Sequence, residues 1–305
     1  MHTKNLKWVF LILLALIWGS SFILIKKGLV GLSPVQVGSL RSVFAAMFLL
    51  LIGLKSLRHI KRDQWKWLAL SGLLGTFFPA YLFSFAETEI DSAIVSILNS
   101  TTPLLSMIAG LLFFGAVFIR HKFIGVLIGL LGTAALIFGG AAVNPDQNYW
   151  YSLLVILASL FYGFNANIVK TKLSSLPALA ITTGNFMVIG PLALLVLATT
   201  GFFSHEVLTA PEAPLSLFFI AILGVIGTGM ALIIFNRLIQ ISDPVFSTSV
   251  TYLVPIIALG WGILDGEAFS GFQLLSGLVI ILGVLITNKP PKKQVVELEE
   301  KKKAA

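Results

Sequence analysis

Ten apolar runs, each about 20 residues long, constrain this chain more than any other feature. A helix needs about 20 residues to cross the roughly 30 Å hydrocarbon core of a bilayer. Helices satisfy their own backbone hydrogen bonds in lipid, which an open sheet edge cannot do. The sequence therefore predicts an all-α integral membrane protein with ten transmembrane helices, at residues 8–26, 34–54, 67–86, 92–114, 122–140, 150–169, 177–200, 215–236, 244–264 and 271–288.

Composition supports lipid rather than water as the surrounding solvent. Of the 305 residues, 57% are hydrophobic and 11% are charged, whereas a soluble domain is about 45–50% apolar and about 25% charged. A soluble chain of this length would need a charged surface around one or two cores, and these charges are too few to build it. The absence of cysteine also excludes disulfides and thiol chemistry.

The positive charges lie almost entirely on one side of the predicted protein. Of the 21 Lys and Arg residues, 18 lie in the tails and connections on the side of the N-terminus. The exceptions are Lys26, Lys27 and Arg41. Cytoplasmic loops carry such an excess, so we expect a multi-pass protein of the cell (inner) membrane with both termini in the cytoplasm. Contact with the anionic headgroups of the lipid bilayer accounts for the net charge of +8, and no nucleic-acid partner is needed to explain it.

The second half of the chain repeats the order of residues in the first half. An offset of 152 places GLLGT (72–76) over GVIGT (224–228) and Pro103 over Pro255, and an offset of 144 places Trp18 over Tyr162 and Lys26 over Lys170. Steady offsets in the same order indicate a duplication. We expect two five-helix repeats, 1–142 and 143–288, followed by a charged cytoplasmic tail, 289–305. Because five is odd, the second repeat is inverted.

Inverted repeats indicate a mechanism as well as a fold. Two such halves can exchange conformations and so produce an inward-open and an outward-open state, with the substrate near the membrane midplane between them. The sequence therefore predicts a secondary transporter that works by alternating access. The alternative is a duplication that is kept only for packing.

Polar residues form one face of the fourth predicted span and of its partner, the ninth. Proline lacks an N–H and clashes with the carbonyl four residues earlier, so Pro103 should free the carbonyl of Asn99, and Pro255 that of Thr251. Broken helices beside a cavity are typical of transporter sites. The alternative is that the hydroxyls bond neighbouring helices and the prolines only bend the chain. The polar face comprises Ser92, Ser96, Asn99, Pro103 and Ser106, spaced by 4, 3, 4 and 3, and Thr248, Thr251 and Pro255 in the partner.

Other spans contribute polar and aromatic residues at matching depths. Pro103 and Pro255 are expected to shape their helices, and Asn99 is the residue most expected to touch substrate. The candidate substrate-binding residues are Trp18, Ser21, Arg41, Tyr81, Ser96, Asn99, Tyr162, Asn165, Asn185, Thr248, Thr251 and Tyr252.

Charged and small residues inside the spans have separate interpretations. A charge at the bilayer centre costs about 2.5 to 3.5 kcal/mol on insertion scales, so we expect Arg41 to pair with a substrate carboxylate or an outer acidic side chain such as Glu87; an interfacial anchor is the alternative. Lys26 and Lys170 end the first helix of each repeat, where a cation suits the helix dipole. The glycines of the fifth and tenth spans indicate close packing of these two helices at the periphery.

These residues resemble the EamA branch of the drug/metabolite transporter superfamily, whose members have ten helices as two inverted repeats. The resemblance covers Trp8 to Asn288. The first half departs from it, because Phe114-Gly115 stands where the second half has Gly266-Glu267; we interpret that glutamate as a structural cap. The resemblance rests on ALIWGSSFILIK (15–26), on Arg41, on the prolines of NSTTPLL and TYLVPII, and on GILDGEAFSGFQLLSGLVIILGVLI (262–286).

The resemblance implies export or facilitated movement of a small-molecule substrate, such as an amino acid-like, neutral or zwitterionic amphipathic compound. No predicted span has a carboxylate at midplane depth, which favours a facilitator or exchanger. A proton is the alternative coupling ion, and it would be carried by a peripheral group such as Glu87.

A channel and a membrane-embedded enzyme are the alternatives to a transporter. A channel would need symmetry about a pore, and a single pair of inverted repeats fits two rocking halves better. A membrane-embedded enzyme would need convergent catalytic groups, but the histidines lie in tails or connections and no metal-ligand spacing exists. We expect neither enzymatic activity nor a cofactor or metal.

Overall fold

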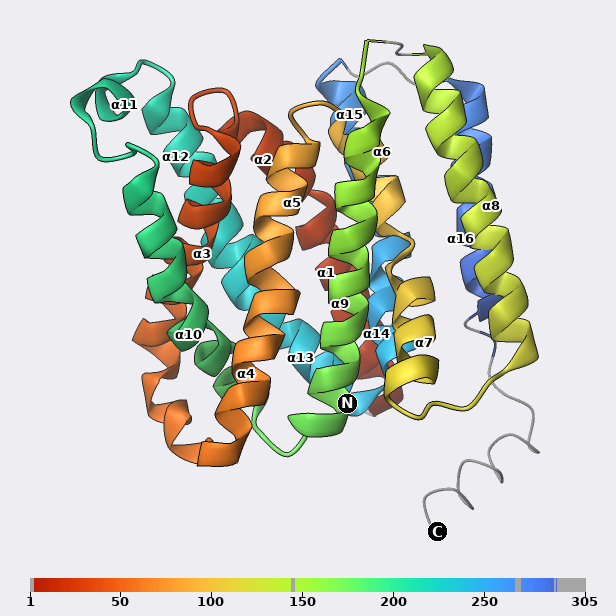
Figure 1. Cartoon of the computed structure of the whole chain (residues 1–305). Coiled ribbons are helices and arrows are strands. Elements are labelled where there is room, and N and C mark those ends of the chain that lie inside the picture. Colours follow the sequence, from red (N-terminus) through yellow and green to blue (C-terminus); the bar gives the residue numbers. More distant parts are fainter. Residues whose placement is uncertain (1–2, 144–145, 267–269, 288, 290–305) are drawn as a thin grey trace.

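The structure is a computed structural model in which residues 3–143, 146–266, 270–287 and 289 are described. Every regular element in these ranges is a helix, and no strand occurs among them (Figure 1). The prediction of an all-α integral membrane protein is confirmed. The predicted cytoplasmic tail beyond Lys289, together with Glu267, lies outside the described residues.

Eight helical segments of the described chain are long and apolar enough to cross a membrane. They coincide with the predicted spans one to four and six to nine. Two further helices, α8 (Arg120–Val143) and α16 (Gly271–Thr287), occupy the positions of the fifth and tenth spans. The total of ten crossings, and the division into repeats at residue 142, remain predictions.

Several spans consist of two to four helical pieces rather than one. In the first half the pieces are α1 (Thr3–Gly19) and α2 (Ser21–Gly28); α3 (Pro34–Gly53) and η1 (Leu54–His59); η2 (Arg62–Gln64), α4 (Trp65–Gly72), η3 (Leu73–Phe77) and α5 (Phe78–Ala86); and α6 (Ser92–Asn99) and α7 (Thr102–Phe113).

The second half is divided in a similar way, and the short helix α11 (His205–Thr209) lies in one of its connections. Its spans are η4 (Tyr149–Tyr151) and α9 (Ser152–Lys172); α10 (Ala178–Thr199); α12 (Ala213–Ile222), η5 (Leu223–Met230) and α13 (Ala231–Ile241); and α14 (Pro244–Thr248), η6 (Ser249–Tyr252) and α15 (Val254–Leu264).

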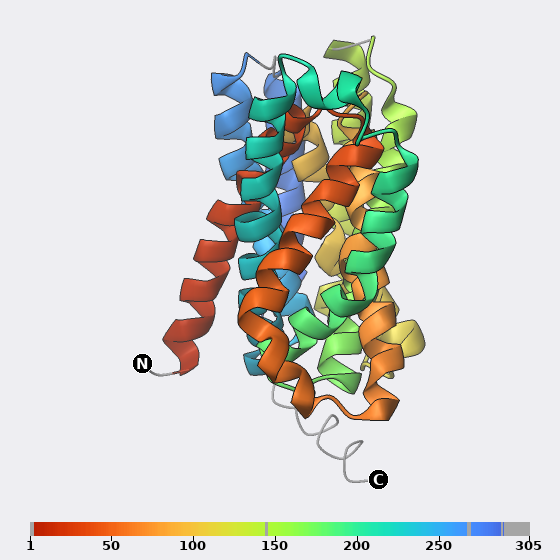
Figure 2. The same ribbon diagram turned by 90° about the vertical axis from the view of Figure 1, so that its left-hand side faces the viewer.

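The directions of the helices define two ends of the bundle. In Figure 2 the red helix α1 rises along one edge from the lower end of the bundle, which we call the N-terminal side. Helix α9, which the offset of 144 matches to α1, runs in the opposite direction (Figure 1). Contacts agree with this assignment, because Trp8 packs on Phe246 at the N-terminal side, while Lys26 lies with Asp265 at the opposite side.

Helices α8 and α16 pack against each other at the edge of the bundle (Figure 1). A Cβ atom at Gly283 would lie 2.5 Å from the carbonyl oxygen of Gly125, and one at Gly132 would lie 2.9 Å from the amide nitrogen of Ile280. Their backbones therefore touch where glycine removes the side chain. The predicted close packing is confirmed at Gly125, Gly132 and Gly283, whereas Gly277 has open space around it.

The fourth span is broken where the proline was expected to break it. Helix α6 ends at Asn99 and α7 begins at Thr102, with Pro103 in its first turn. The carbonyl oxygen of Asn99 accepts a hydrogen bond from the Thr102 hydroxyl at 2.7 Å. This carbonyl was predicted to be a free hydrogen-bond acceptor, and that prediction is wrong, because the Thr102 hydroxyl already donates to it. In the ninth span, the 3₁₀ turn η6 separates α14 from α15, whose first turn holds Pro255.

The third and eighth spans each contain a π-helical segment, which the helical periodicity did not predict. Segments η3 and η5 fall on the matched motifs GLLGT and GVIGT. A π-helix pairs residues five apart and so leaves some backbone groups of the ordinary pattern unmatched. In η5, the Thr228 hydroxyl donates to the carbonyl of Leu223, five residues earlier, at 3.0 Å.

Candidate functional site

A cavity of about 70 Å³ lies inside the bundle, lined by residues of seven spans. This volume is enough for a few water molecules. The lining is mostly apolar, with hydroxyl, amide and guanidinium groups among the aromatic rings. The predicted residues that line it are Trp18, Ser21, Arg41, Asn99, Tyr162, Asn165, Thr248 and Thr251.

The other predicted residues lie outside this lining. The Tyr81 hydroxyl is 3.0 Å from that of Ser39, Ser96 donates to the carbonyl of Ala93 in its own helix, and Tyr252 is buried in an apolar cluster. The Asn185 amide lies 3.1 Å from the Ser71 hydroxyl, which donates to Oδ1 of Asn165 at 2.6 Å. Asn185 therefore reaches the cavity only through Ser71 and Asn165.

Asn99 lies at the cavity wall and is 7% exposed. Its Oδ1 atom accepts hydrogen bonds from the hydroxyls of Thr102 at 3.1 Å and Ser159 at 3.3 Å. These two hydrogen bonds fix the orientation of the Asn99 side chain through its oxygen atom.

Ser106 fits the alternative interpretation of the polar face, in which its polar groups bond a neighbouring helix. Its carbonyl and hydroxyl accept hydrogen bonds from Nδ2 of Asn167 on α9, at 2.9 and 3.2 Å.

Besides Thr102, which follows Asn99, the cavity lining contains two threonines that were not predicted from the sequence, Thr76 and Thr228. They end the motifs GLLGT and GVIGT, and the two π-helical segments bring both to the cavity. The repeat already marked these motifs, so their pairing was the signal that could have identified them. The Trp18 indole nitrogen donates to the carbonyl of Gly227 at 3.0 Å, which ties α1 to η5 beside Thr228.

Arg41 is buried, with 9% of its surface exposed, and it is the one charged residue among those that line the cavity. Helix α3 starts with a capping box, in which the Ser33 hydroxyl and the Gln36 side chain each accept a backbone N–H of the other residue. Arg41 follows about two turns later. Its Nε donates to the Thr228 hydroxyl at 2.7 Å, and the Tyr162 phenol lies beside it.

The predicted alternative partner of Arg41, Glu87, is not bonded to it. Glu87 lines a different pocket on the side of Lys26, together with Asp91 and Asp146. The interfacial-anchor interpretation also fails, because the Arg41 side chain bonds to η5 at the cavity rather than pointing out of the bundle.

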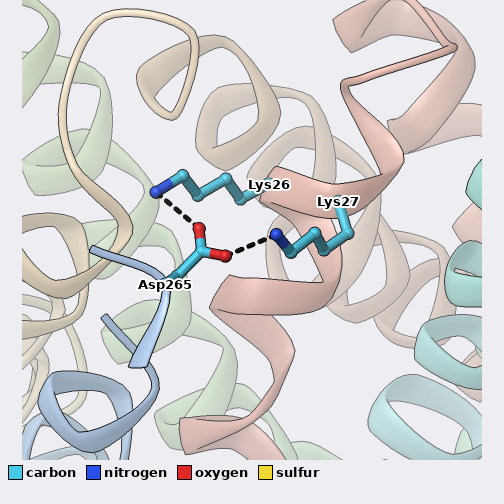
Figure 3. A network of polar contacts seen from close by, with 3 residues as sticks. All are labelled: Lys26, Lys27 and Asp265. Carbon is cyan, nitrogen blue, oxygen red and sulfur yellow. Dashed lines mark hydrogen bonds and ion pairs between the residues drawn. The ribbon is translucent and has the colours of Figure 1, made fainter. Parts of the chain in front are cut away.

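Ion pairs join two helix ends on the side opposite the N-terminus. The Lys26 Nζ lies 2.9 Å from Oδ2 of Asp265, and Lys27 pairs with the other carboxylate oxygen (Figure 3). Lys26 and Lys27 belong to the last turn of α2, and Asp265 directly follows α15. The pairs therefore link the first span to the ninth.

Lys170 makes a different kind of contact on the N-terminal side. Its ammonium group donates to the carbonyls of Ile239 at 3.1 Å, Gln240 at 3.3 Å and Ser242. These carbonyls end α13, whereas Lys170 was predicted to cap its own helix. Lys26 likewise bonds to a neighbouring element. The amino group of a lysine extends beyond the end of its own helix, so it reaches the acceptors of the adjacent one.

The sequence profile of the EamA-like transporter family matches residues 6–138 and 149–289. The chain belongs to the EamA-like transporter family. As a family member with multiple apolar helices it is a multi-pass membrane protein. The resemblance to the EamA family is confirmed, and the family identity indicates a transporter rather than an enzyme.

Relatives of this EamA-like chain are named as transporters. It is 28% identical to the "Uncharacterized inner membrane transporter YedA" of Escherichia coli (strain K12), over 90% of this chain and 88% of the relative. It is 28% identical to the "Uncharacterized transporter YdfC" of Bacillus subtilis (strain 168), over 89% and 87%. It is 23% identical to the "Probable amino-acid metabolite efflux pump" of Salmonella typhimurium, over 90% and 92%.

The fold resembles that of a solved protein, titled "Crystal structure of protein". It superposes with a TM-score of 0.66 and 17% sequence identity, covering 92% of this chain and 95% of that chain. This likeness shows the fold alone.

Proposed function

We propose that the chain is a secondary transporter that moves a small metabolite across the membrane by alternating access, as an exporter or facilitator. The substrate class we favour is an amino acid-like, neutral or zwitterionic amphipathic compound. The observation that carries this proposal is the central cavity, whose lining residues come from both predicted repeats. A site between inverted repeats is the arrangement that alternating access requires.

The cavity favours a carrier over a channel. A volume of about 70 Å³ accommodates a few water molecules, whereas a channel needs a continuous pore with a ring of equivalent groups. The cavity lining is asymmetric, with Arg41 on one wall and amides on another. The name of one relative, an amino-acid metabolite efflux pump, supports an amino acid-like substrate.

The Asp265 ion pairs supply one gate for this mechanism. They hold the ends of α2 and α15 together on the side opposite the N-terminus, which the distribution of Lys and Arg predicts to be the outer side. Opening the cavity to that side requires these two ends to separate, so the pairs would break during transport. Both termini would then be cytoplasmic.

The charges of the lining favour a facilitator or an exchanger. No carboxylate lines the cavity among the described residues, so the substrate site has no obvious proton-carrying group. Proton antiport would have to use a peripheral group such as Glu87. Strict dependence of flux on an imposed pH gradient would contradict the facilitator proposal.

The function is tested by counterflow in proteoliposomes that contain the full chain. A panel of labelled amino acids, nucleosides and cationic dyes is measured with the wild type, with Asn99→Ala and with Arg41→Gln. We expect counterflow of at least one compound and a lower rate in both variants. Unchanged flux in both variants would reject the cavity as the substrate site, and an absence of counterflow for the whole panel would reject the proposed transport.

A further inference from the structure

Arg41 is a buried cation that lacks a counterion. No carboxylate of the described residues lies within ion-pair distance of Arg41. None of the other residues that line the cavity is charged, so an opposite charge would have to come from a ligand. An unpaired charge inside a membrane protein is costly, and the cost falls when an opposite charge arrives. The cavity therefore favours a ligand with a negative group.

The hydrogen bonds of Arg41 orient its side chain for such a group. The Thr228 hydroxyl receives the Nε–H at 2.7 Å and itself donates to Leu223, so η5 fixes one edge of the guanidinium plane. A guanidinium carries five N–H donors. The donors on its terminal nitrogens form a fork that matches both oxygens of a carboxylate.

Thr76 provides a second, independent sign of a ligand. It is the residue of the first half that the offset of 152 matches to Thr228, it is 3% exposed, and it lines the same cavity. Its hydroxyl makes no hydrogen bond in the structure. Buried hydroxyls are nearly always bonded, and a substrate in the cavity would supply the missing partner.

We propose that the cavity recognises its substrate by a carboxylate, which binds Arg41, while the Thr76 hydroxyl bonds a second polar atom of the same molecule. This rests on the proposed transport function and narrows it to compounds that have a free carboxylate and no net positive charge. Organic cations are excluded, because the cavity lining has no carboxylate that could pair with a positive charge on the ligand. The Tyr162 phenol, beside Arg41, completes the polar end of the site.

Matched ligands test this proposal by binding to the purified full chain. The probes are leucine, phenylalanine and threonine, the monocarboxylates 4-methylpentanoate and phenylacetate, and the primary amide of each. Binding is read as the rise in melting temperature with ligand concentration. We expect at least one carboxylate to bind and its amide to bind at least about tenfold more weakly, because the charge-assisted fork is lost.

Substitutions separate the two recognition groups. Arg41→Gln should remove the preference for acid over amide, because both the charge and the guanidinium fork are lost, whereas Arg41→Lys should only reduce it, because the charge remains without the fork. Thr76→Val should weaken binding by about three- to tenfold and leave the preference unchanged. The control is Thr183→Val, since Thr183 also has a buried hydroxyl without a hydrogen bond but does not line the cavity; it should bind as the wild type does.

The result that overturns the proposal is equal binding of acids and amides, unchanged binding by Arg41→Gln, or no binding by any carboxylate in the panel. Failure of the transport proposal is a separate result. Carboxylate binding without counterflow would reject transport and keep the site, whereas counterflow of amides and cations without a preference for acids would reject the site and keep transport.

Discussion

The Lys26 ammonium and the Asp265 carboxylate, 2.9 Å apart, join the end of α2 to the end of α15. Their counterpart on the N-terminal side uses other chemistry. Lys170, which the offset of 144 matches to Lys26, bonds to backbone carbonyls. The residue that precedes the positive-φ glycine after α7 is Phe114, whereas the one before the positive-φ glycine after α15 is Asp265. The two matched lysines therefore contact different acceptors, a carboxylate at the end of α15 and backbone carbonyls at the end of α13.

Removing the charge of Asp265 should favour opening on its side. The chain has no cysteine, so a single Thr251→Cys in the cavity lining reports access to a charged, membrane-impermeant thiol reagent. We expect Asp265→Asn to raise the labelling rate from that side about two- to tenfold, as two partly exposed ion pairs are lost. Glu212→Gln, an exposed carboxylate in a connection on the same side, is the control and should leave the rate unchanged. An equal rate in Asp265→Asn would show that the pairs do not close the cavity.

The pH dependence of this access follows from the same contacts. Hydrogen bonds from Lys27 and Lys26 lower the pKa of the Asp265 carboxyl below its usual value of 3.8. The paired state is fully stabilised above that value and loses its stabilisation only as the pH falls through the lowered pKa. The ratio of labelling rates between Asp265→Asn and the parent should therefore stay constant between about pH 5 and pH 8. A ratio that falls to one at about pH 5 would mean that Asp265 titrates with a raised pKa.

Salt should act on the same gate. The Lys26 and Lys27 side chains are 33% and 41% exposed, so dissolved ions screen their attraction to Asp265. We expect added sodium chloride to raise the Thr251→Cys labelling rate in the parent and to have a smaller effect in Asp265→Asn. Equal salt effects in both proteins would contradict an electrostatic gate.

The contact between α8 and α16 predicts a difference between two glycines of the same helix. A Cβ at Gly283 would meet the backbone of Gly125 and Gly129 at 2.5 Å, whereas a Cβ at Gly277 would meet nothing within 4 Å. Gly283→Ala should destabilise the protein by about 1–3 kcal/mol because the backbone must move, and Gly277→Ala should be neutral or slightly stabilising. Thermal unfolding in detergent measures both. Equal melting temperatures would mean that the helices are further apart.

A glycine at the cavity tests the position of Asn165. A Cβ at Gly75 would collide with the Asn165 side-chain nitrogen, while Ser71 holds the Asn165 oxygen at 2.6 Å. Gly75→Ala should displace this amide and raise the KM for the transported compound by about three- to tenfold. Gly260→Ala, with open space around the new methyl group, should have the wild-type KM. A wild-type KM in Gly75→Ala would remove Asn165 from the site.

Much of the cavity lining could be predicted, because the internal repeat pairs each position of the first half with one of the second half. Trp18 and Tyr162, and likewise Ser21 and Asn165, are pairs at one offset, and each pair lines the cavity. A polar or aromatic residue at the same depth in both halves is hard to explain by packing of one helix alone. The break at Pro103 was also predictable, since proline acts through its own ring and missing N–H.

Errors arose where the helix departs from its ordinary period. Tyr81 follows the π-helical segment η3, in which each turn takes more residues than an α-turn. Tyr81 was selected by its residue type and depth, without allowance for this change of period, and it contacts Ser39 rather than the cavity. Thr76 and Thr228, which lie in the two π-helical segments, were not selected at all. The free carbonyl expected at Asn99 was wrong for a local reason, because the neighbouring Thr102 hydroxyl bonds to it.

The most direct test of alternating access is to lock the Asp265 gate and measure transport. Cysteines replace Lys26 and Asp265 in this cysteine-free chain, and a short, reducible thiol cross-linker joins them in proteoliposomes. Counterflow of the labelled compound should stop when the two helix ends are linked and return when the linker is reduced. Counterflow that continues at the uncross-linked rate while the ends remain joined would contradict a carrier that opens on this side.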